Sequence, residues 1–567
     1  MDKVDILIKN VNLLDVVSEK IYKASVAIKY GKVFGFEADS ARTIINGDGK
    51  YLAPGFIDGH VHIESSMLTP SRFAEVIAPR GTTTVVSDPH EIANVLGIYG
   101  VKLFMEESKN LPINLYLTVP SCVPATDLET SGARIGCEEI EELMGMDGII
   151  GLGEMMNFPG VINKDQEVLK KISIAKKYGK IVDGHAPKLS GKILDEYISA
   201  GIMSDHESTE PDEAMEKLRK GMYLMIREGS VAKNMDSLLG YMIENDIDTN
   251  RCMLVSDDIH PYDLLTIGHM DYKIRKAISM GLDPIKAFQM VTLNPAQYFN
   301  LNTGRIEVGM NADVVILSSS DDSFSDFVVD TTINNGRIAA KDGKLTEKIP
   351  KFVYEDRVVR SVKLKRKLKP EDFEIHSEEE VEVRVIGVKE GDIIGESLTK
   401  KLHPINGKLN SDVQQDVLKI AVVERHKKTG NIGKGFVHGF GLKNGTIAST
   451  VAHDSHNIVI VGTDDVDMSI AANFLEGIGG IVIVKGGKVL NHLQLEVAGL
   501  MTTKNANYVN EKLDRLHVKA KELGCKLKSP FMTMSFLSLP VVPELKLTDR
   551  GLVDVKKFEI VPLLIQK

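Results

Sequence analysis

The stretch Pro54-Gly55-Phe56-Ile57-Asp58-Gly59-His60-Val61-His62 indicates how the chain is built and which chemistry it can carry. Its residues predict a short buried strand, and side chains two positions apart on a strand face the same way. The imidazoles of His60 and His62 therefore point into one space, a geometry that suits a bound metal ion. Two histidines at a strand end can also make structural hydrogen bonds, so the rest of the chain has to decide between these interpretations.

Composition narrows the class of protein. A chain of 567 residues is too long for a single core, so two to four domains are expected. The net charge of −10 argues against nucleic-acid binding, which usually needs a basic surface. No uninterrupted apolar run reaches the roughly 20 residues of a membrane span. Acidic residues in Met1-Asp2-Lys3-Val4-Asp5 stand where a signal peptide is basic. Four scattered cysteines indicate reduced thiols, and we expect a cytoplasmic protein without membrane or nucleic-acid partners.

One pattern repeats eight times over residues 56–260. An apolar strand is followed by a polar loop and a helical stretch, such as Val168–Tyr178 or Ser190–Ala200. Near-continuous apolar strands that alternate with helices predict a parallel sheet covered on both faces, and eight units predict a (β/α)8 barrel. The predicted strands are Phe56–His62, Thr82–Ser87, Asn114–Val119, Ile149–Glu154, Lys180–His185, Gly201–His206, Met222–Arg227 and Cys252–Asp257.

Polar side chains fall where these strands end. The active site of a (β/α)8 barrel lies at the carboxyl ends of its strands. The residues at those ends are His60 and His62 on the first strand, Asp88-Pro89-His90-Glu91 after the second, Glu154 on the fourth, His185 on the fifth, His206 on the sixth and Asp257 on the eighth. This register is stronger evidence for a site than any single motif.

The segments on either side of the barrel have a different sequence pattern. Short strands and turns in residues 1–52 and 305–348 predict one small β-sandwich domain, into which the barrel, residues 53–304, is inserted. A linker over 349–375 carries a basic stretch. A glycine-rich C-terminal α+β domain, residues 376–567, follows. The fold class is therefore α/β, with an additional α+β domain.

The residue types at the barrel mouth suit two divalent metal ions. Imidazoles and carboxylates are ligands for Zn, Fe or Mn, whereas soft metals prefer thiolates. The expected ligands are His60, His62, Glu154, His185, His206 and Asp257. Glu154 can bridge two ions, and a shared water can then lose a proton near neutral pH and become the nucleophile. Asp257 can hold one metal and also accept that proton.

The pattern resembles the amidohydrolase superfamily and, within it, the adenine deaminase family. The superfamily places H-x-H on strand one, histidines on strands five and six, and aspartate on strand eight. It commonly has a carbamylated lysine on strand four, whereas this chain has Glu154 there, which resembles the adenine deaminase variant. Further matching segments are residues 88–95, 183–187, 204–207, 256–258, 437–441 and 451–457.

The resemblance implies hydrolysis of adenine to hypoxanthine and ammonia, in purine salvage, by a metal-activated hydroxide. It also implies Mn²⁺ or Fe²⁺ rather than Zn²⁺, and we expect a homodimer or higher homo-oligomer. The chain lacks the H-x-E and P-C-x-x-C pattern of the zinc cytidine-type deaminases. The main alternative is another hydrolase of the superfamily that cleaves a cyclic or acyl amide, because pocket contacts alone select the substrate. A catalytically dead scaffold would have lost ligands, and all six are present.

Other polar residues are open to two interpretations. We assign Asp257, Glu154, His90 and Glu91 to catalysis, and Arg227, Ser230, Asp258, His453 and His456 to substrate binding. His90 and Glu91 could instead cap a loop, Arg227 could form a salt bridge, and Asp258 competes with Asp257 for the metal. The segment from His453 to His456 could be a second metal site, a lid over the barrel or a hydrogen-bonded turn. We expect the third domain to pack over the barrel mouth and exclude water.

Overall fold

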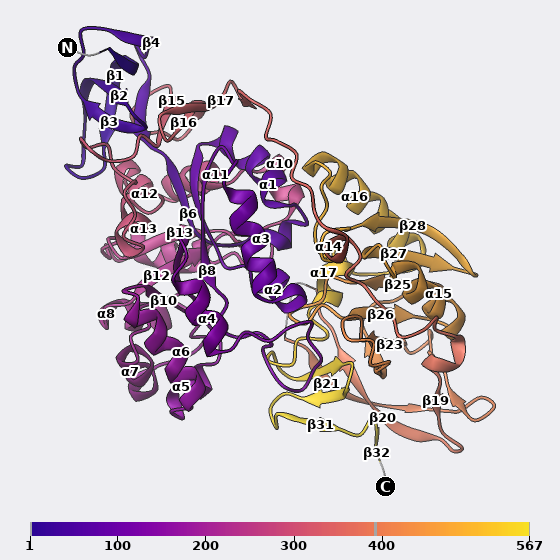
Figure 1. The fold of residues 1–567 in the computed structure, drawn as a ribbon. Coiled ribbons are helices and arrows are strands. Elements are labelled where there is room, and N and C mark those ends of the chain that lie inside the picture. The colour runs from indigo at the N-terminus through magenta and orange to yellow at the C-terminus, as the bar shows by residue number, and fades with distance from the viewer. Residues whose placement is uncertain (1–2, 391–393, 566–567) are drawn as a thin grey trace.

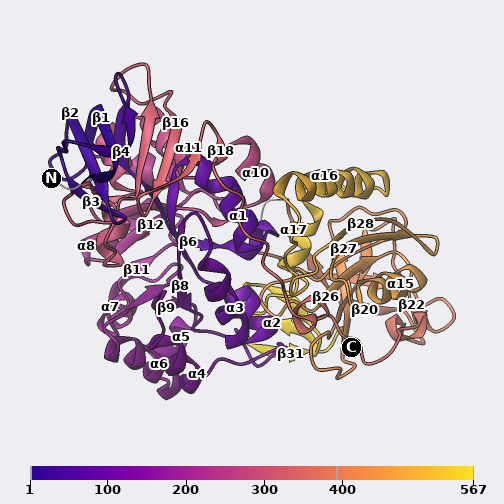
Figure 2. The ribbon, with the colours of Figure 1, turned by 45° about the horizontal axis from the view of Figure 1, so that its top comes forward.

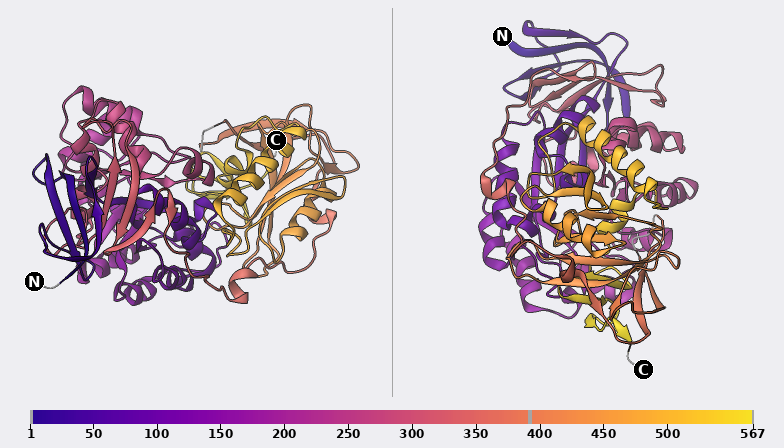
Figure 3. Two further views of the ribbon diagram at one scale, coloured as in Figure 1. Left: turned by 90° about the horizontal axis from the view of Figure 1, so that it is seen from above. Right: turned by 90° about the vertical axis from the view of Figure 1, so that its right-hand side faces the viewer.

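The chain forms three units in the computed structural model, which describes residues 3–390 and 394–565 (Figure 1). A small sheet unit carries the N-terminal strands, a barrel lies in the middle, and the C-terminal unit lies against the barrel at the opposite end of the molecule (Figure 3). Met1 and Asp2 of the acidic start lie outside the described residues. Within the described part of the chain, no helix has the length and apolar character needed to cross a bilayer.

The middle unit confirms the predicted barrel of parallel strands and outer helices. Parallel ladders join β6 through β10 in chain order and, separately, β11 through β13. The strands are β6 (Phe56–His62), β7 (Thr82–Ser87), β8 (Asn114–Val119), β9 (Ile149–Met155), β10 (Ile181–Gly184), β11 (Ser204–Asp205), β12 (Tyr223–Arg227) and β13 (Cys252–Val255). The flanking helices include α1 (Pro70–Ile77), α2 (His90–Leu96), α6 (Gln166–Lys177), α7 (Gly191–Ser199) and α10 (Pro261–Thr266).

Side chains close the two gaps between these ladders. At the first gap, the backbone N–H of Gly184 donates to Ser204 Oγ at 3.0 Å. At the second, the N–H of Ser256 donates to Asp58 Oδ1 at 3.1 Å, and the short β14 (Asp257–Asp258) pairs with β6. These bonds replace ladder bonds, and they bring the carboxyl end of the eighth strand beside the two histidines of the first.

The flanks of the barrel share one sheet. In the described residues its order is β18-β17-β16-β15-β5-β1-β2-β3, with β4 on β1. The antiparallel pair of β5 (Tyr51–Pro54) and β15 (Val314–Ser318) joins the two flanks. The other strands are β1 (Val4–Asp15), β2 (Lys20–Lys29), β3 (Lys32–Gly35), β4 (Ala41–Asn46), β16 (Val328–Asn334), β17 (Arg337–Lys341) and β18 (Lys344–Leu345). The chain thus enters and leaves the barrel at neighbouring strands.

The C-terminal unit is built on a second, mainly antiparallel sheet. Over the described residues its order is β21-β20-β24-β23-β26-β25-β27-β28, with β32 on β20. Helix α15 (Asp465–Leu475) is capped by the preceding Asp464, whose side chain accepts from the N–H of Asp467, and Asn505 caps α16 (Ala506–Glu522) in the same way. The sheet strands are β20 (Val381–Gly387), β21 (Glu396–Leu402), β23 (Val417–Val423), β24 (Ile432–His438), β25 (Thr446–Ser449), β26 (Ile458–Gly462), β27 (Gly480–Lys485), β28 (Lys488–Gln494) and β32 (Leu564–Ile565).

The C-terminal unit shares a hydrophobic core with the barrel. Buried Leu68 and Phe73 of the barrel belong to the same apolar cluster as Val497 and Met501. The N–H of Thr502 donates to the carbonyl of Met67 at 2.9 Å, and α16 packs against α1 and α10 (Figure 2). Cutting the chain near residue 345 would expose this apolar surface, so a truncated barrel is a poor test of what the C-terminal unit does.

Candidate active site

The candidate ligands converge at the carboxyl ends of the barrel strands. His60 and His62 end β6, Glu154 lies on β9, and Asp257 lies on β14. His185 and His206 come immediately after β10 and β11. Their side chains are buried except for that of His185, which is partly exposed. The candidate ligands that the sequence places at the strand ends therefore lie close together in the structure.

Asp257, and not Asp258, faces the histidines. Its backbone has φ of 56°, a left-handed conformation that turns the chain out of β13. Asp257 Oδ1 lies 3.2 Å from His62 Nε2 and 3.9 Å from His60 Nε2. Asp258 instead accepts a hydrogen bond from Ser65 Oγ at 2.5 Å. The geometry favours Asp257 over Asp258 as the carboxylate of the cluster.

Both oxygens of Glu154 lie among imidazole nitrogens. Oε2 lies 2.7 Å from His185 Nδ1 and 3.1 Å from His206 Nε2. Oε1 lies 3.4 Å from His90 Nδ1 and 3.6 Å from His62 Nε2. Burial alone would raise the pKa of Glu154, but hydrogen bonds from His185 and His206 hold it well below its usual range. An ionised carboxylate between two sets of imidazoles has the geometry that a bridging ligand needs.

Partners on the far side of the rings orient the first two histidines. His60 Nδ1 lies 3.1 Å from Asp183 Oδ2, and His62 Nδ1 lies 3.0 Å from the carbonyl oxygen of Asp88. These contacts place the proton of each neutral ring on Nδ1 and leave Nε2 as a lone-pair donor. His60 Nε2 has no hydrogen-bond partner in the described part of the chain. Asp183 had no role in the sequence interpretation, although its place two residues before His185 is a usable signal.

The donor set fits divalent metal ions. In the described residues, the overlapping groups that bring three ligand atoms within 4.8 Å of one another include His60, Glu154 and His206; His60, His62 and Asp257; His62, His90 and Glu154; and His185, His206 and Glu207. Neutral imidazoles and carboxylates are the borderline ligands that Mn, Fe and Zn accept. Buried nitrogen and oxygen acceptors that face each other cost free energy unless a proton or a cation lies between them.

Arg227 pairs with two acidic side chains of the cluster, Glu207 and Asp257. Its Nη1 contacts Glu207 Oε1 and lies 3.2 Å from Asp257 Oδ2, and its Nε donates to Asn234 at 3.1 Å. Burial would raise the pKa of Asp257, but its contacts with His62 and Arg227 hold it well below its usual range. Of the two interpretations of Arg227, the structure contains the salt bridge. Glu207, which the sequence leaves as an exposed loop acid without an assigned role, is the second acid of that bridge.

Ser230 lies in a hydrogen-bonded turn. Its hydroxyl donates to Asp263 Oδ2 and accepts from the N–H of His260 at 2.8 Å, while its own N–H donates to the carbonyl of Asp258 at 2.8 Å. These bonds tie the loops after β12 and β14 together.

His453 and His456 reach the barrel from the C-terminal unit. His453 Nδ1 lies 2.5 Å from Glu91 Oε1, and His456 Nε2 contacts Glu91 Oε2. Glu91 stands on the first turn of α2, next to His90. All four side chains are buried. The C-terminal unit therefore contacts Glu91, which is next in sequence to His90 of the cluster around Glu154.

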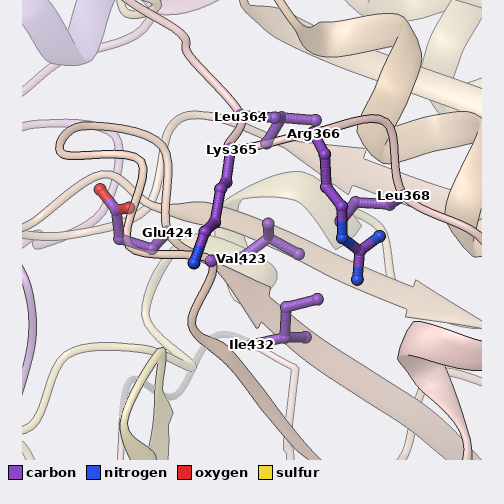
Figure 4. A pocket seen from close by; sticks show the side chains of 8 residues that line it. Leu364, Lys365, Arg366, Leu368, Val423, Glu424 and Ile432 are labelled. Atoms are coloured by element: carbon purple, nitrogen blue, oxygen red, sulfur yellow. The ribbon is translucent and has the colours of Figure 1, made fainter.

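A separate cavity of about 130 Å³ lies in the C-terminal unit (Figure 4). Leu364, Val423 and Ile432 form apolar walls, and Lys365 and Arg366 lie beside them. None of the candidate site residues lines it, and Arg366 is engaged by Asp372 at 2.5 Å. The cavity is independent of the barrel cluster.

Comparison with known proteins covers nearly the whole chain. The family model "Amidohydrolase family" matches residues 51–339, and "Adenine deaminase C-terminal domain" matches residues 392–559. Adenine deaminases of Methanothrix thermoacetophila and Archaeoglobus fulgidus are each 44% identical and cover 99% of this chain, which spans 97% and 96% of their lengths. A crystal structure of an adenine deaminase aligns with a TM-score of 0.47 at 20% identity, over 60% of this chain and 100% of that one. The chain belongs to the adenine deaminase family of the amidohydrolase superfamily.

Proposed function

We propose that this protein is an adenine deaminase that hydrolyses adenine to hypoxanthine and ammonia in purine salvage. The observation that carries the proposal is the near full-length match to relatives named adenine deaminase, through both the barrel and the C-terminal unit. The acidic net charge supports action without nucleic acid. We further propose a cytoplasmic enzyme, independent of membranes, that assembles as a homodimer or higher homo-oligomer.

We propose a centre of two divalent ions, Mn²⁺ or Fe²⁺ in preference to Zn²⁺. The proposed ligands are His60, His62, Glu154, His185, His206 and Asp257, which the distances among their nitrogen and oxygen atoms support. Bound divalent ions would lower the pKa of water enough for it to attack at neutral pH. Glu154 would bridge the two positions, because imidazoles approach both of its oxygens.

Asp257 is the proposed proton acceptor of the reaction. Its carboxylate faces the histidines of β6, with Oδ1 3.2 Å from His62 Nε2, so it is placed to take a proton from the attacking water. The left-handed turn at Asp257 aims the side chain at the histidines of β6. The proton it holds can then be returned to the amino group that leaves as ammonia.

The remaining candidates are proposed to bind the purine or to assist catalysis. Arg227, Ser230 and Asp258 are retained as substrate contacts, although each already has protein partners in the structure. Adenine would have to supplement or displace these partners. His90, Glu91, His453 and His456 form one connected group beside Glu154, and that connection supports a joint role.

Removing the metal should abolish the activity. Treating the purified chain with a chelator is expected to stop ammonia release from adenine, and adding Mn²⁺ or Fe²⁺ should restore it at about two ions per chain. Elemental analysis alongside the assay measures the ratio, and circular dichroism checks that the fold survives. Full activity in metal-free protein would contradict the proposed centre.

A further inference from the structure

Glu91 is a buried carboxylate surrounded by three imidazoles. Its side chain is 2% exposed. His453 and His456 of the C-terminal unit approach one oxygen each, and His90 Nε2 lies 3.4 Å from Oε1. Burial would raise the pKa of Glu91, but His453 and His456 hold it well below its usual range. Glu91 is therefore an acceptor that spans the boundary between the two units.

The backbone determines which nitrogen of His456 carries the proton. The N–H of Ala452 donates to His456 Nδ1 at 3.1 Å, so Nδ1 must present a lone pair. The ring proton of neutral His456 then lies on Nε2 and points at Glu91 Oε2. A protonated Nε2 cannot ligate a metal. Although Glu91, His453 and His456 have the spacing of a cation site, this tautomer favours a hydrogen-bonded group instead.

The loop that carries the two histidines is held firmly. The N–H of His453 donates to the carbonyl of Ser535 at 2.9 Å, and its ring stacks on Phe536 with 4.7 Å between centroids. The carbonyl of His456 accepts from buried Arg425 Nε at 2.5 Å. Asn457 Nδ2 donates across the boundary to the carbonyl of Thr130 at 2.9 Å. The donors are thus oriented before any substrate binds, which is what a positioning role requires.

We propose that His453 and His456 are positioning residues for the deamination: they hold Glu91, and Glu91 orients His90 so that its Nδ1 faces Glu154. The inference rests on the proposed function. When His90 Nε2–H points at Glu91, Nδ1 is left as a lone-pair nitrogen 3.4 Å from Glu154 Oε1. This nitrogen is buried and has no hydrogen-bond partner within residues 3–390 and 394–565. In the neutral ring this nitrogen therefore presents its lone pair to the reaction centre.

His90 Nδ1 can serve in one of the two proton transfers that the reaction requires. Hydrolysis of adenine moves both protons of one water: one ends on the departing ammonia and the other on the ring nitrogen beside the carbonyl carbon of hypoxanthine. Asp257 accounts for one transfer, and His90 is placed to make the other. The Glu91 carboxylate would stabilise the imidazolium that forms while His90 holds the proton. The C-terminal unit contributes to catalysis by keeping that carboxylate in place.

The test compares substitutions at positions 453 and 456 that keep or remove the N–H group directed at Glu91. The amide nitrogen of asparagine can replace Nδ1, and that of glutamine can replace Nε2, so His453→Asn and His456→Gln retain a donor toward Glu91. His453→Leu and His456→Leu remove it. The leucine variants should lose roughly 10- to 100-fold in kcat, with a smaller change in KM and unchanged metal content. The amide variants should recover most of the loss. His492→Leu, on edge strand β28 and in ring contact with Phe474, serves as the control.

Glu91→Gln gives an independent arm if a leucine variant folds poorly. It should lower kcat to a similar extent, and adding His456→Leu to it should cost little more, because both changes break one chain of contacts. Leucine variants with normal kcat would overturn the proposal. So would an equal loss in the leucine and amide variants that follows thermal stability, or a third metal ion that is present in the unaltered chain and lost in the variants. Absence of adenine turnover in the unaltered chain would instead overturn the proposed function.

Discussion

Replacing Glu154 with glutamine is expected to lower adenine turnover by about 10³-fold or more, because loss of a bridging carboxylate should exceed the 10- to 100-fold cost of changing an outer partner of a metal site. Its two oxygens lie 2.7 to 3.6 Å from nitrogens of four histidines. A neutral amide offers only one oxygen and less charge to two cations. Steady-state kinetics with measured metal content gives the effect.

Glu107→Gln is the matched control for this prediction. Glu107 is 2% exposed, so it is as deeply buried as Glu154 at 4%, but it accepts from Ser71 and Tyr354, away from the cluster. Its variant should keep near-normal turnover even if it is less stable. Near-normal turnover in Glu154→Gln would show that another group makes the bridge.

The second large effect is expected at Asp257. Asp257→Asn should reduce turnover by about 10³-fold, within the range that a general base contributes, because the amide cannot accept a proton at neutral pH. The fold and much of the metal should remain. Asp258→Asn should be milder, because Asp258 bonds Ser65 and not the histidines. Parallel kinetics on the two variants decides the assignment, and a larger loss at Asp258 would reverse it.

Strand order was predictable because the barrel strands are continuous apolar runs. β6, β7 and β8 have the bounds that the sequence predicts. The sixth strand is shorter than predicted, only Ser204–Asp205, because β11 borders a gap in the sheet and, among the described residues, has a ladder partner on one side only. A hydrophobic pattern shows which segments are buried but does not show where neighbouring ladders separate.

The sequence could predict which residues of the site stand at the strand ends, but not how their side chains are oriented or which distant residues contact them. Asp257 was favoured over Asp258, but the left-handed backbone at Asp257 that turns its side chain toward His62 has no signature in the apolar pattern. The contact of Glu91 with His453 and His456 joins residues that are more than 360 positions apart in the sequence. Periodicity contains no information about such pairs, so the sequence could predict a third domain over the barrel mouth but not its contacts with Glu91.

The most direct test of the account is a product assay on the purified full-length chain with its metal content known. Incubation with adenine should release ammonia and hypoxanthine in equal amounts, while hydantoin and dihydroorotate should remain unchanged. A chain that holds about two divalent ions and leaves adenine intact would contradict the account, and hydrolysis of a cyclic amide by that same preparation would show which activity the barrel carries instead.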